Sequence, residues 1–97
     1  MVIFTEKTYE NEKGYFYIPV TWREEFKLYS GAEVGIDCYN NSIIVIDKAG
    51  TREFKQIVTE KGNITIPLEL RKKLINQSYH IIIEQRDERI ILAPKLN

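Results

Sequence analysis

The side chains in this sequence that are best suited to chemistry are cations, and most of them lie in its second half. Residues 1–49 carry five Lys or Arg against eight Asp or Glu, whereas residues 50–97 carry nine against six. The two halves therefore have net charges of −3 and +3, although the whole chain is neutral. The local excess consists of Arg52, Lys55, Lys61, Arg71, Lys72 and Lys73.

Lysine and arginine neutralise phosphates, and arginine can also read a guanine edge through two hydrogen bonds. We therefore expect a polyanion, if one is bound, to be met mainly by the second half of the chain. The alternative is a solvated surface on which the asymmetry of charge has no function.

Residues that could carry out catalysis are few. His80 is the only histidine and Cys38 the only cysteine, and a nucleophilic pair would need both at one site with an orienting group. A metal site needs several His, Cys or carboxylate ligands at defined spacing, and the sequence has neither such a cluster nor a glycine-rich phosphate loop. We therefore expect no enzymatic activity, no cofactor and no bound metal.

The single cysteine also excludes a disulfide within the chain and fits a reducing compartment. No apolar run approaches the roughly 20 residues that cross a membrane, and the charged segment 1–12 does not have the pattern of a signal peptide. We expect a cytoplasmic protein that does not enter a membrane.

The strongest pattern is a repeat at an offset of 48 residues. Residues 12–28 read EKGYFYIPVTWREEFKL, and residues 60–76 read EKGNITIPLELRKKLIN. A unit of this length cannot bury its own apolar face, so the copies must pack on each other or on copies from another chain. We expect one domain, residues 1–97, that consists of a first repeat at 1–48 and a second repeat at 52–97.

Each copy predicts the same β-β-α-β-β order. The first strands are expected at 2–9 and 53–59, and the second strands at 15–18 and 63–66, where apolar residues alternate. A Lys-Gly pair at 13–14 and at 61–62 marks the turn between them, because glycine accepts a positive φ. Two hairpins follow, one with strands 33–39 and 42–47 around Asn40-Asn41, and one with strands 79–85 and 89–93.

Between the second strand and the hairpin, Pro19 and Pro67 are expected to open a short helix, because proline suits the first helical turn. Trp22, Phe26 and Tyr29 then share one face of the first helix, as Leu70 and Leu74 do in the second. The hairpin strands contain runs such as residues 43–46, 81–83 and 90–92 that are apolar on both faces. Such strands are covered on both sides, which requires the other repeat or a second chain.

The order of turn glycine, alternating strand, Ile-Pro, short helix with an arginine four residues after the proline, and apolar hairpin resembles the AbrB/MazE/SpoVT swapped-hairpin family. The resemblance covers nearly the whole chain and occurs twice, as in tandem MraZ-like regulators. It implies a mainly β fold with one short helix per repeat, in which two units exchange hairpins to form a barrel. Both units would lie on this one chain as an intrachain pseudo-dimer.

The resemblance also implies DNA binding through basic residues near the turn and on the short helix. The matching helix residues are Arg23 and Arg71, with neighbours Glu24 and Lys72. After the turn glycine, where the family usually has arginine, this chain has Tyr15 and Asn63. The expected DNA contacts are Lys13, Arg23, Arg52, Lys55, Lys61, Asn63, Arg71, Lys72 and Lys73.

Several alternatives remain open from the sequence. The tyrosines at 15 and 17 could simply lie on a half-exposed strand, and Arg23 or Arg71 could form ion pairs within the molecule. The expected function is a transcriptional regulator that binds double-stranded DNA. The alternatives are an antitoxin-like protein, or a protein-binding module that uses the acidic first repeat. Whatever its function, the protein could also form homo-oligomers, as dimers or larger assemblies.

Overall fold

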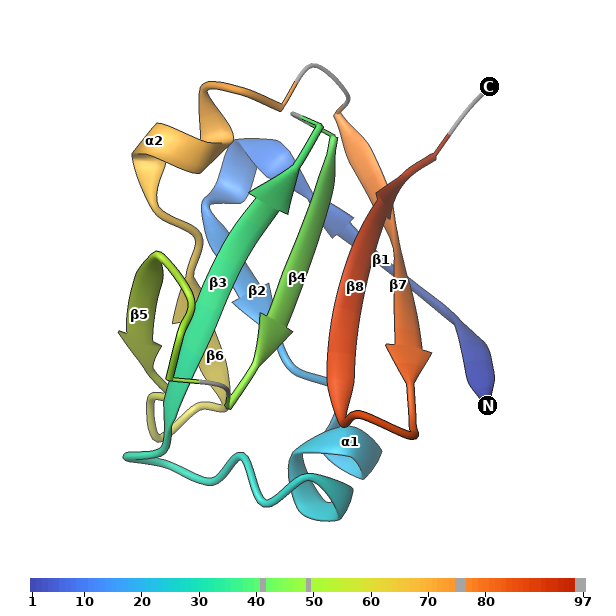
Figure 1. The fold of residues 1–97 in the computed structure, drawn as a ribbon, viewed down its shortest axis with the longest axis vertical. Coiled ribbons are helices and arrows are strands. Elements are labelled where there is room, and N and C mark those ends of the chain that lie inside the picture. The colour runs from blue at the N-terminus through green and yellow to red at the C-terminus, as the bar shows by residue number, and fades with distance from the viewer. Residues whose placement is uncertain (41, 49, 75–76, 96–97) are drawn as a thin grey trace.

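The structure is a computed structural model that describes residues 1–40, 42–48, 50–74 and 77–95, and it is mainly β (Figure 1). Its first four strands are β1 (Val2–Glu10), β2 (Tyr15–Tyr17), β3 (Glu33–Tyr39) and β4 (Ile43–Asp47). The others are β5 (Phe54–Ile57), β6 (Asn63–Thr65), β7 (Ser78–Glu84) and β8 (Arg89–Pro94). The α-helices are α1 (Val20–Glu25) and α2 (Leu68–Arg71), and a 3-10 turn, Asn11–Lys13, follows β1.

Six strands form one open sheet in the order β1-β7-β8-β4-β3-β5. The hairpins β3–β4 and β7–β8 lie side by side through the antiparallel pair β4–β8, in which Val45 is opposite Ile91. The outer strand of each hairpin pairs with the first strand of the other half of the chain, β7 with β1 and β3 with β5. Both halves are therefore needed to complete the sheet.

The remaining strands, β2 and β6, form a two-stranded antiparallel ribbon that lies behind β3 and β4 in Figure 1. Phe16 is paired with Ile64, so two positions 48 residues apart are direct partners at the centre of the ribbon. Both side chains are buried, with 1% and 0% of their surface exposed, in one core cluster with Ile36 and Ile83 of the large sheet. The ribbon thus covers the inner face of the sheet and presents its other face outward.

The two helices are short and lie at opposite ends of the molecule (Figure 1). Pro19 and Pro67 were expected in the first helical turn. In the structure they occupy the N-cap position, one residue earlier. Trp22, Phe26 and Tyr29 were expected to share one face of the first helix, and this prediction is wrong for Tyr29. The helix ends at Glu25, and a left-handed Lys27 (φ 56°) reverses the chain, so Phe26 is buried whereas Tyr29 is 56% exposed.

The expected hairpin strands agree with β3, β4, β7 and β8 to within a residue. Asn40 has the left-handed φ of 54° that the first hairpin turn was expected to use, and Asn41 lies outside the described residues. The first strand of the second half, β5, is shorter than the expected 53–59. No helix among the described residues is both long enough and apolar enough to cross a membrane.

Candidate nucleic-acid interface

The outward face of the β2–β6 ribbon carries side chains that have no role in the core. Tyr15 and Tyr17 are 54% and 56% exposed, and their rings meet edge to face with centroids 6.5 Å apart. Across the ribbon, Tyr15 pairs with the exposed Thr65 and Tyr17 pairs with Asn63. Strand alternation explains the arrangement, since the intervening Phe16 and Ile64 point inward. One face of the ribbon therefore offers two aromatic and two polar side chains.

Lysines lie beyond both ends of this face. Lys13 and Lys61 each precede a turn glycine and are exposed. Because β2 and β6 are antiparallel, their N-terminal turns lie at opposite ends of the ribbon. The side chain of Asn63 is held by the hydroxyl of Thr59, which donates to its Oδ1 at 2.8 Å. The ribbon thus has a polar centre and a cation at each end.

Arg71 is packed across the turn of the other half of the chain. Its Nε donates to the carbonyl of Asn11 at 3.3 Å, and its Nη2 donates to the carbonyl of Glu12 at 3.2 Å. A Cβ added to Gly14 would lie only 2.7 Å from Arg71 Nη1. The guanidinium therefore lies directly against a glycine whose φ of 75° already disfavours other residues. Its partners are backbone carbonyls, where the sequence had suggested a carboxylate as the alternative to DNA.

Arg23 occupies the corresponding place at the second turn. A Cβ added to Gly62 would collide with the Arg23 guanidinium. Arg23 Nε is buried and has no hydrogen-bond partner in the part of the chain that the structure describes, so its environment differs from that of Arg71. Each arginine therefore belongs to one half of the chain in sequence and to the turn of the other half in space. For that reason, the opposite net charges of the two halves do not correspond to two separate surfaces.

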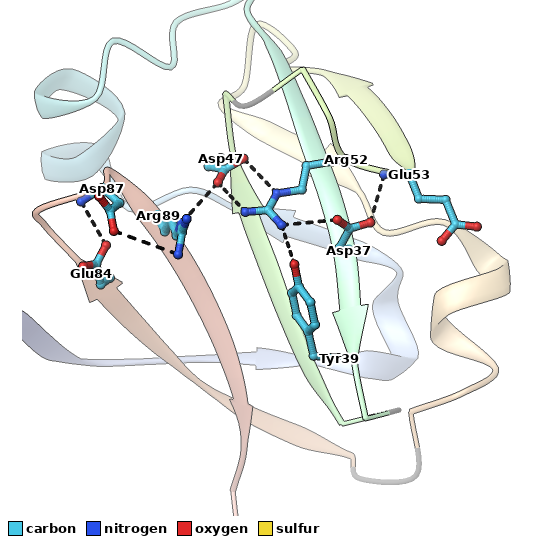
Figure 2. A network of polar contacts seen from close by, with 8 residues as sticks. All are labelled: Asp37, Tyr39, Asp47, Arg52, Glu53, Glu84, Asp87 and Arg89. Atoms are coloured by element: carbon cyan, nitrogen blue, oxygen red, sulfur yellow. Dashed lines mark hydrogen bonds and ion pairs between the residues drawn. The ribbon is translucent and has the colours of Figure 1, made fainter.

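Arg52, which the sequence placed among the DNA contacts, lies in an ion-pair network on the large sheet (Figure 2). Its guanidinium donates to Asp47 at 3.1 and 2.7 Å, to Asp37 at 3.2 Å and to the hydroxyl of Tyr39 at 2.6 Å. The hydrogen bonds to Asp47 hold the pKa of Arg52 above its usual value. Only 10% of the Arg52 side chain is exposed, so little of it is left to meet a ligand.

The network also joins the two hairpins. Asp47 at the end of β4 accepts hydrogen bonds from Arg52, and it forms an ion pair with Arg89 of β8 at 3.4 Å. Asp47 is 5% exposed and is the only buried charged residue among the described residues. Its row in the sheet contains Gly35 and Lys55, which are cross-strand neighbours. This row lies on the outer face, opposite to the face that the ribbon covers.

The expected set of DNA contacts is therefore divided between the two sides of the molecule. Lys13, Lys61 and Asn63 lie on or beside the ribbon, with Arg23 and Arg71 packed against its turns. Lys72 and Lys73 are exposed immediately after α2. Arg52 and Lys55 lie on the outer face of the sheet and do not join the others.

Sequence reasoning missed Lys7, which lines a groove beside β2 together with Lys13 and Arg23. Lys7 lies 48 residues before Lys55, so the repeat could have identified it as the equivalent of an expected contact. The two lysines nevertheless lie on different faces of the sheet. Tyr9 is buried, whereas Ile57, 48 residues later, is 53% exposed and Val58 is buried instead. The first strands of the two halves are therefore out of step by one residue, and such a slip exchanges the two faces of a strand.

Residues suited to catalysis are not brought together. Cys38 is opposite Ile44, which faces the core, whereas the ring of His80 lies 6.4 Å from that of the exposed Phe4 on the outer face. Among the described residues, no group of three or more His, Cys, Asp or Glu side chains could hold a metal ion. Comparison with family models, with curated proteins and with solved structures finds no match for this chain.

Proposed function

We propose that this protein is a DNA-binding transcriptional regulator of the AbrB type, and that it meets double-stranded DNA with the β2–β6 ribbon. The observation that carries the proposal is the outward face of the ribbon, with Tyr15, Tyr17, Asn63 and Thr65 at its centre and a lysine beyond each end. A two-stranded ribbon is one of the elements that the major groove admits. The face is solvent-exposed and contributes nothing to the core.

The chemistry of the face suits base edges and phosphates. Asparagine can form a pair of hydrogen bonds with adenine, and threonine can contact a base or the methyl group of thymine. Lys13 and Lys61 would neutralise phosphates on either side of the ribbon. The hydrogen bond from Thr59 fixes the Asn63 side chain before DNA arrives, which lowers the entropic cost of ordering it on binding.

The finer architecture is part of the same proposal. The strand order, in which each hairpin is bordered by the first strand of the other half, supports a swapped-hairpin pseudo-dimer of two repeats. The direct pairing of Phe16 with Ile64 supports an approximate two-fold axis through the ribbon. The Arg71–Gly14 and Arg23–Gly62 contacts obey the same axis. A regulator of this kind would act in the cytoplasm.

The test is selection of duplexes from a random-sequence pool at low and near-physiological salt. The wild-type protein should enrich a motif, and its affinity should fall as salt rises. The variant Asn63→Ala/Thr65→Ala should lose the motif preference while it keeps part of the salt-dependent affinity. The control Thr51→Ala/Gln85→Ala, in turns outside the ribbon, should select the wild-type motif. No enrichment and no binding at low salt would refute the proposal.

One observation favours a protein-binding module as the second candidate. Val20 and Leu68, which are 48 residues apart, follow the two helix-opening prolines and are 58% and 57% exposed. An exposed apolar side chain at the start of each helix gains more from burial by a protein than from contact with DNA. A partner captured with an affinity that does not depend on salt, and lost in Val20→Ser/Leu68→Ser, would favour this candidate or an antitoxin-like role.

A further inference from the structure

A groove runs between the edge strand of the large sheet and the ribbon. Residues 7–10 of β1 form one wall, and residues 15–18 in and after β2 form the other. Among the described strands, β1 pairs only with β7 and β2 only with β6, so no strand fills the space between them. The groove has a volume of about 320 Å³, and Tyr15 and Tyr17 connect it to the outward face of the ribbon.

The groove is positively charged, although it lies in the half of the chain whose net charge is negative. Lys7, Lys13 and Arg23 line it, and Glu10 is its one acidic residue. The Glu10 carboxylate already accepts hydrogen bonds from Ser78 at 2.6 Å and from Thr8 at 3.4 Å. Its charge is therefore partly satisfied within the protein, and the three cations are not paired with it.

Other hollows on the surface have the opposite sign. The hollow between α1 and the β7–β8 turn, about 580 Å³, is lined by four acidic residues and three cations. A smaller one of about 170 Å³ is lined by Arg23 with Glu24 and Glu60. An anion drawn to the molecule is therefore favoured in the β1–β2 groove over these two.

Arg23 contributes a further reason. The corresponding Arg71 donates to two backbone carbonyls, whereas Arg23 Nε is buried with no hydrogen-bond partner among the described residues. A buried polar group without a hydrogen-bond partner lowers the stability of the structure that contains it. A phosphate oxygen in the groove would offer the Arg23 guanidinium a hydrogen-bond acceptor, as the two backbone carbonyls do for Arg71.

We propose that the β1–β2 groove holds the phosphodiester backbone of the bound DNA, with Lys7 and Lys13 as its phosphate contacts. Tyr15 and Tyr17, at the boundary between groove and ribbon, pack against the sugars of the same strand. This inference rests on the proposed function, and it reverses the assignment that charge alone suggests. The backbone contacts are led by the first half of the chain, and the second half supplies Asn63 and Thr65 for the bases.

The experiment compares the salt dependence of binding to the selected duplex for three proteins. In Lys7→Gln/Lys13→Gln, two phosphate contacts are lost, so the slope of log affinity against log salt should fall by about 2. The affinity at 100 mM salt should fall by at least about tenfold. The control Lys48→Gln/Lys55→Gln removes the same charge outside the groove and should keep the wild-type slope to within about 0.5.

The outcomes separate the two proposals. Because Lys7 and Lys13 are exposed and are not packed in the core, both variants should unfold in urea as the wild type does. A wild-type slope in Lys7→Gln/Lys13→Gln, with motif selection intact, would overturn the groove while leaving DNA binding in place. An equal loss in both lysine variants would also overturn it, since only net charge would matter. Absence of DNA binding by the wild type would refute the proposed function itself.

Discussion

Two glycines at the turns of the ribbon make close contact with arginines of the opposite half. Gly62 combines a φ of 80° with the Arg23 guanidinium directly beside it. Gly31 has a φ of 90°, but no atom of the described residues lies within 4 Å of an added Cβ there. Gly50 has neither a strained φ nor a close neighbour. These three positions separate the cost of backbone strain from the cost of displacing the arginine.

We predict that Gly50→Ala leaves stability nearly unchanged, that Gly31→Ala costs about 1 kcal/mol, and that Gly62→Ala costs about 2 kcal/mol. The first increment is backbone strain, and the second comes from the displaced Arg23. Urea denaturation gives the three free energies of unfolding. In an Arg23→Ala background the difference between Gly62→Ala and Gly31→Ala should disappear. A Gly62→Ala cost equal to that of Gly31→Ala would mean that the arginine contact contributes nothing.

Tyr9 provides a prediction about pH. Burial outweighs the nearby charge of Arg71 and raises the pKa of Tyr9 to about 12, compared with an ordinary value of 10.0. The folded state therefore favours the neutral phenol, and ionisation of Tyr9 at high pH lowers the free energy of unfolding. The contribution of the neutral phenol is complete below pH 10 and is lost as the pH rises towards 12, by up to about 2 kcal/mol.

Unfolding of the wild type should thus become easier between pH 10 and 12, and Tyr9→Phe should reduce this loss. The measurement is urea denaturation of both proteins at pH 8 and at pH 11.5. Tyr29→Phe is the matched control, because Tyr29 is 56% exposed. An identical pH dependence in Tyr9→Phe and the wild type would contradict the prediction.

At the scale of elements, the Asp47 network adds side-chain ion pairs to the β4–β8 pairing that joins the two hairpins (Figure 2). Asp47 on β4 holds Arg52 and reaches Arg89 on β8, and its side chain is 6% exposed. Removing one partner from a buried ion pair leaves the other charges unpaired, which typically costs about 3–5 kcal/mol.

We predict that Asp47→Ala destabilises the protein by about 3 kcal/mol. Asp87→Ala, whose carboxylate is 52% exposed and 4.0 Å from Arg89, should change stability by less than about 0.5 kcal/mol. Both values come from urea denaturation at neutral pH. Equal effects of the two substitutions would show that the Asp47 ion pairs add nothing to the β4–β8 pairing and the apolar packing of the hairpins.

The sequence was informative about these elements for a physical reason. Apolar runs and the turn signal at Asn40 are local, and they located the hairpin strands to within a residue. The Arg23 and Arg71 contacts across the turns could not be read in the same way. They join residues that are 39 and 57 positions apart in the chain. Neither an arginine nor a glycine in the sequence indicates by its type that the two are in contact.

The candidate interface was also predictable where its residues follow a local pattern, and not where their placement depends on the fold. Asn63 and the turn lysines follow from the repeat, and the structure places Asn63 on the ribbon and the lysines just beyond its two ends. Lys7 and Lys55 occupy equal positions in the repeat, but a slip of one residue in the first strands sends them to opposite faces. Four residues separate the buried Tyr9 from Gly14, whereas three separate the buried Val58 from Gly62. This difference can be recognised only once the buried residue of each strand is known.

At the scale of the whole molecule, the ribbon carries two halves that are related in position but differ in chemistry. Tyr15 and Tyr17 of β2 correspond to Asn63 and Thr65 of β6. A dimer of identical chains would present the same side chains twice and would read a palindrome. Here the two halves are on one chain and present aromatic side chains on one side and polar side chains on the other.

We therefore predict that one chain occupies one site, and that the selected motif is not palindromic. Titration of a selected duplex, followed by light scattering, should give one protein chain per duplex at saturation. Replacing both tyrosines by the residues of the other half, Tyr15→Asn/Tyr17→Thr, should make the ribbon nearly symmetric and shift selection towards a palindrome. A palindromic wild-type motif bound by two chains would mean that recognition lies between copies of the protein, and the ribbon of a single chain would then not be the reading surface.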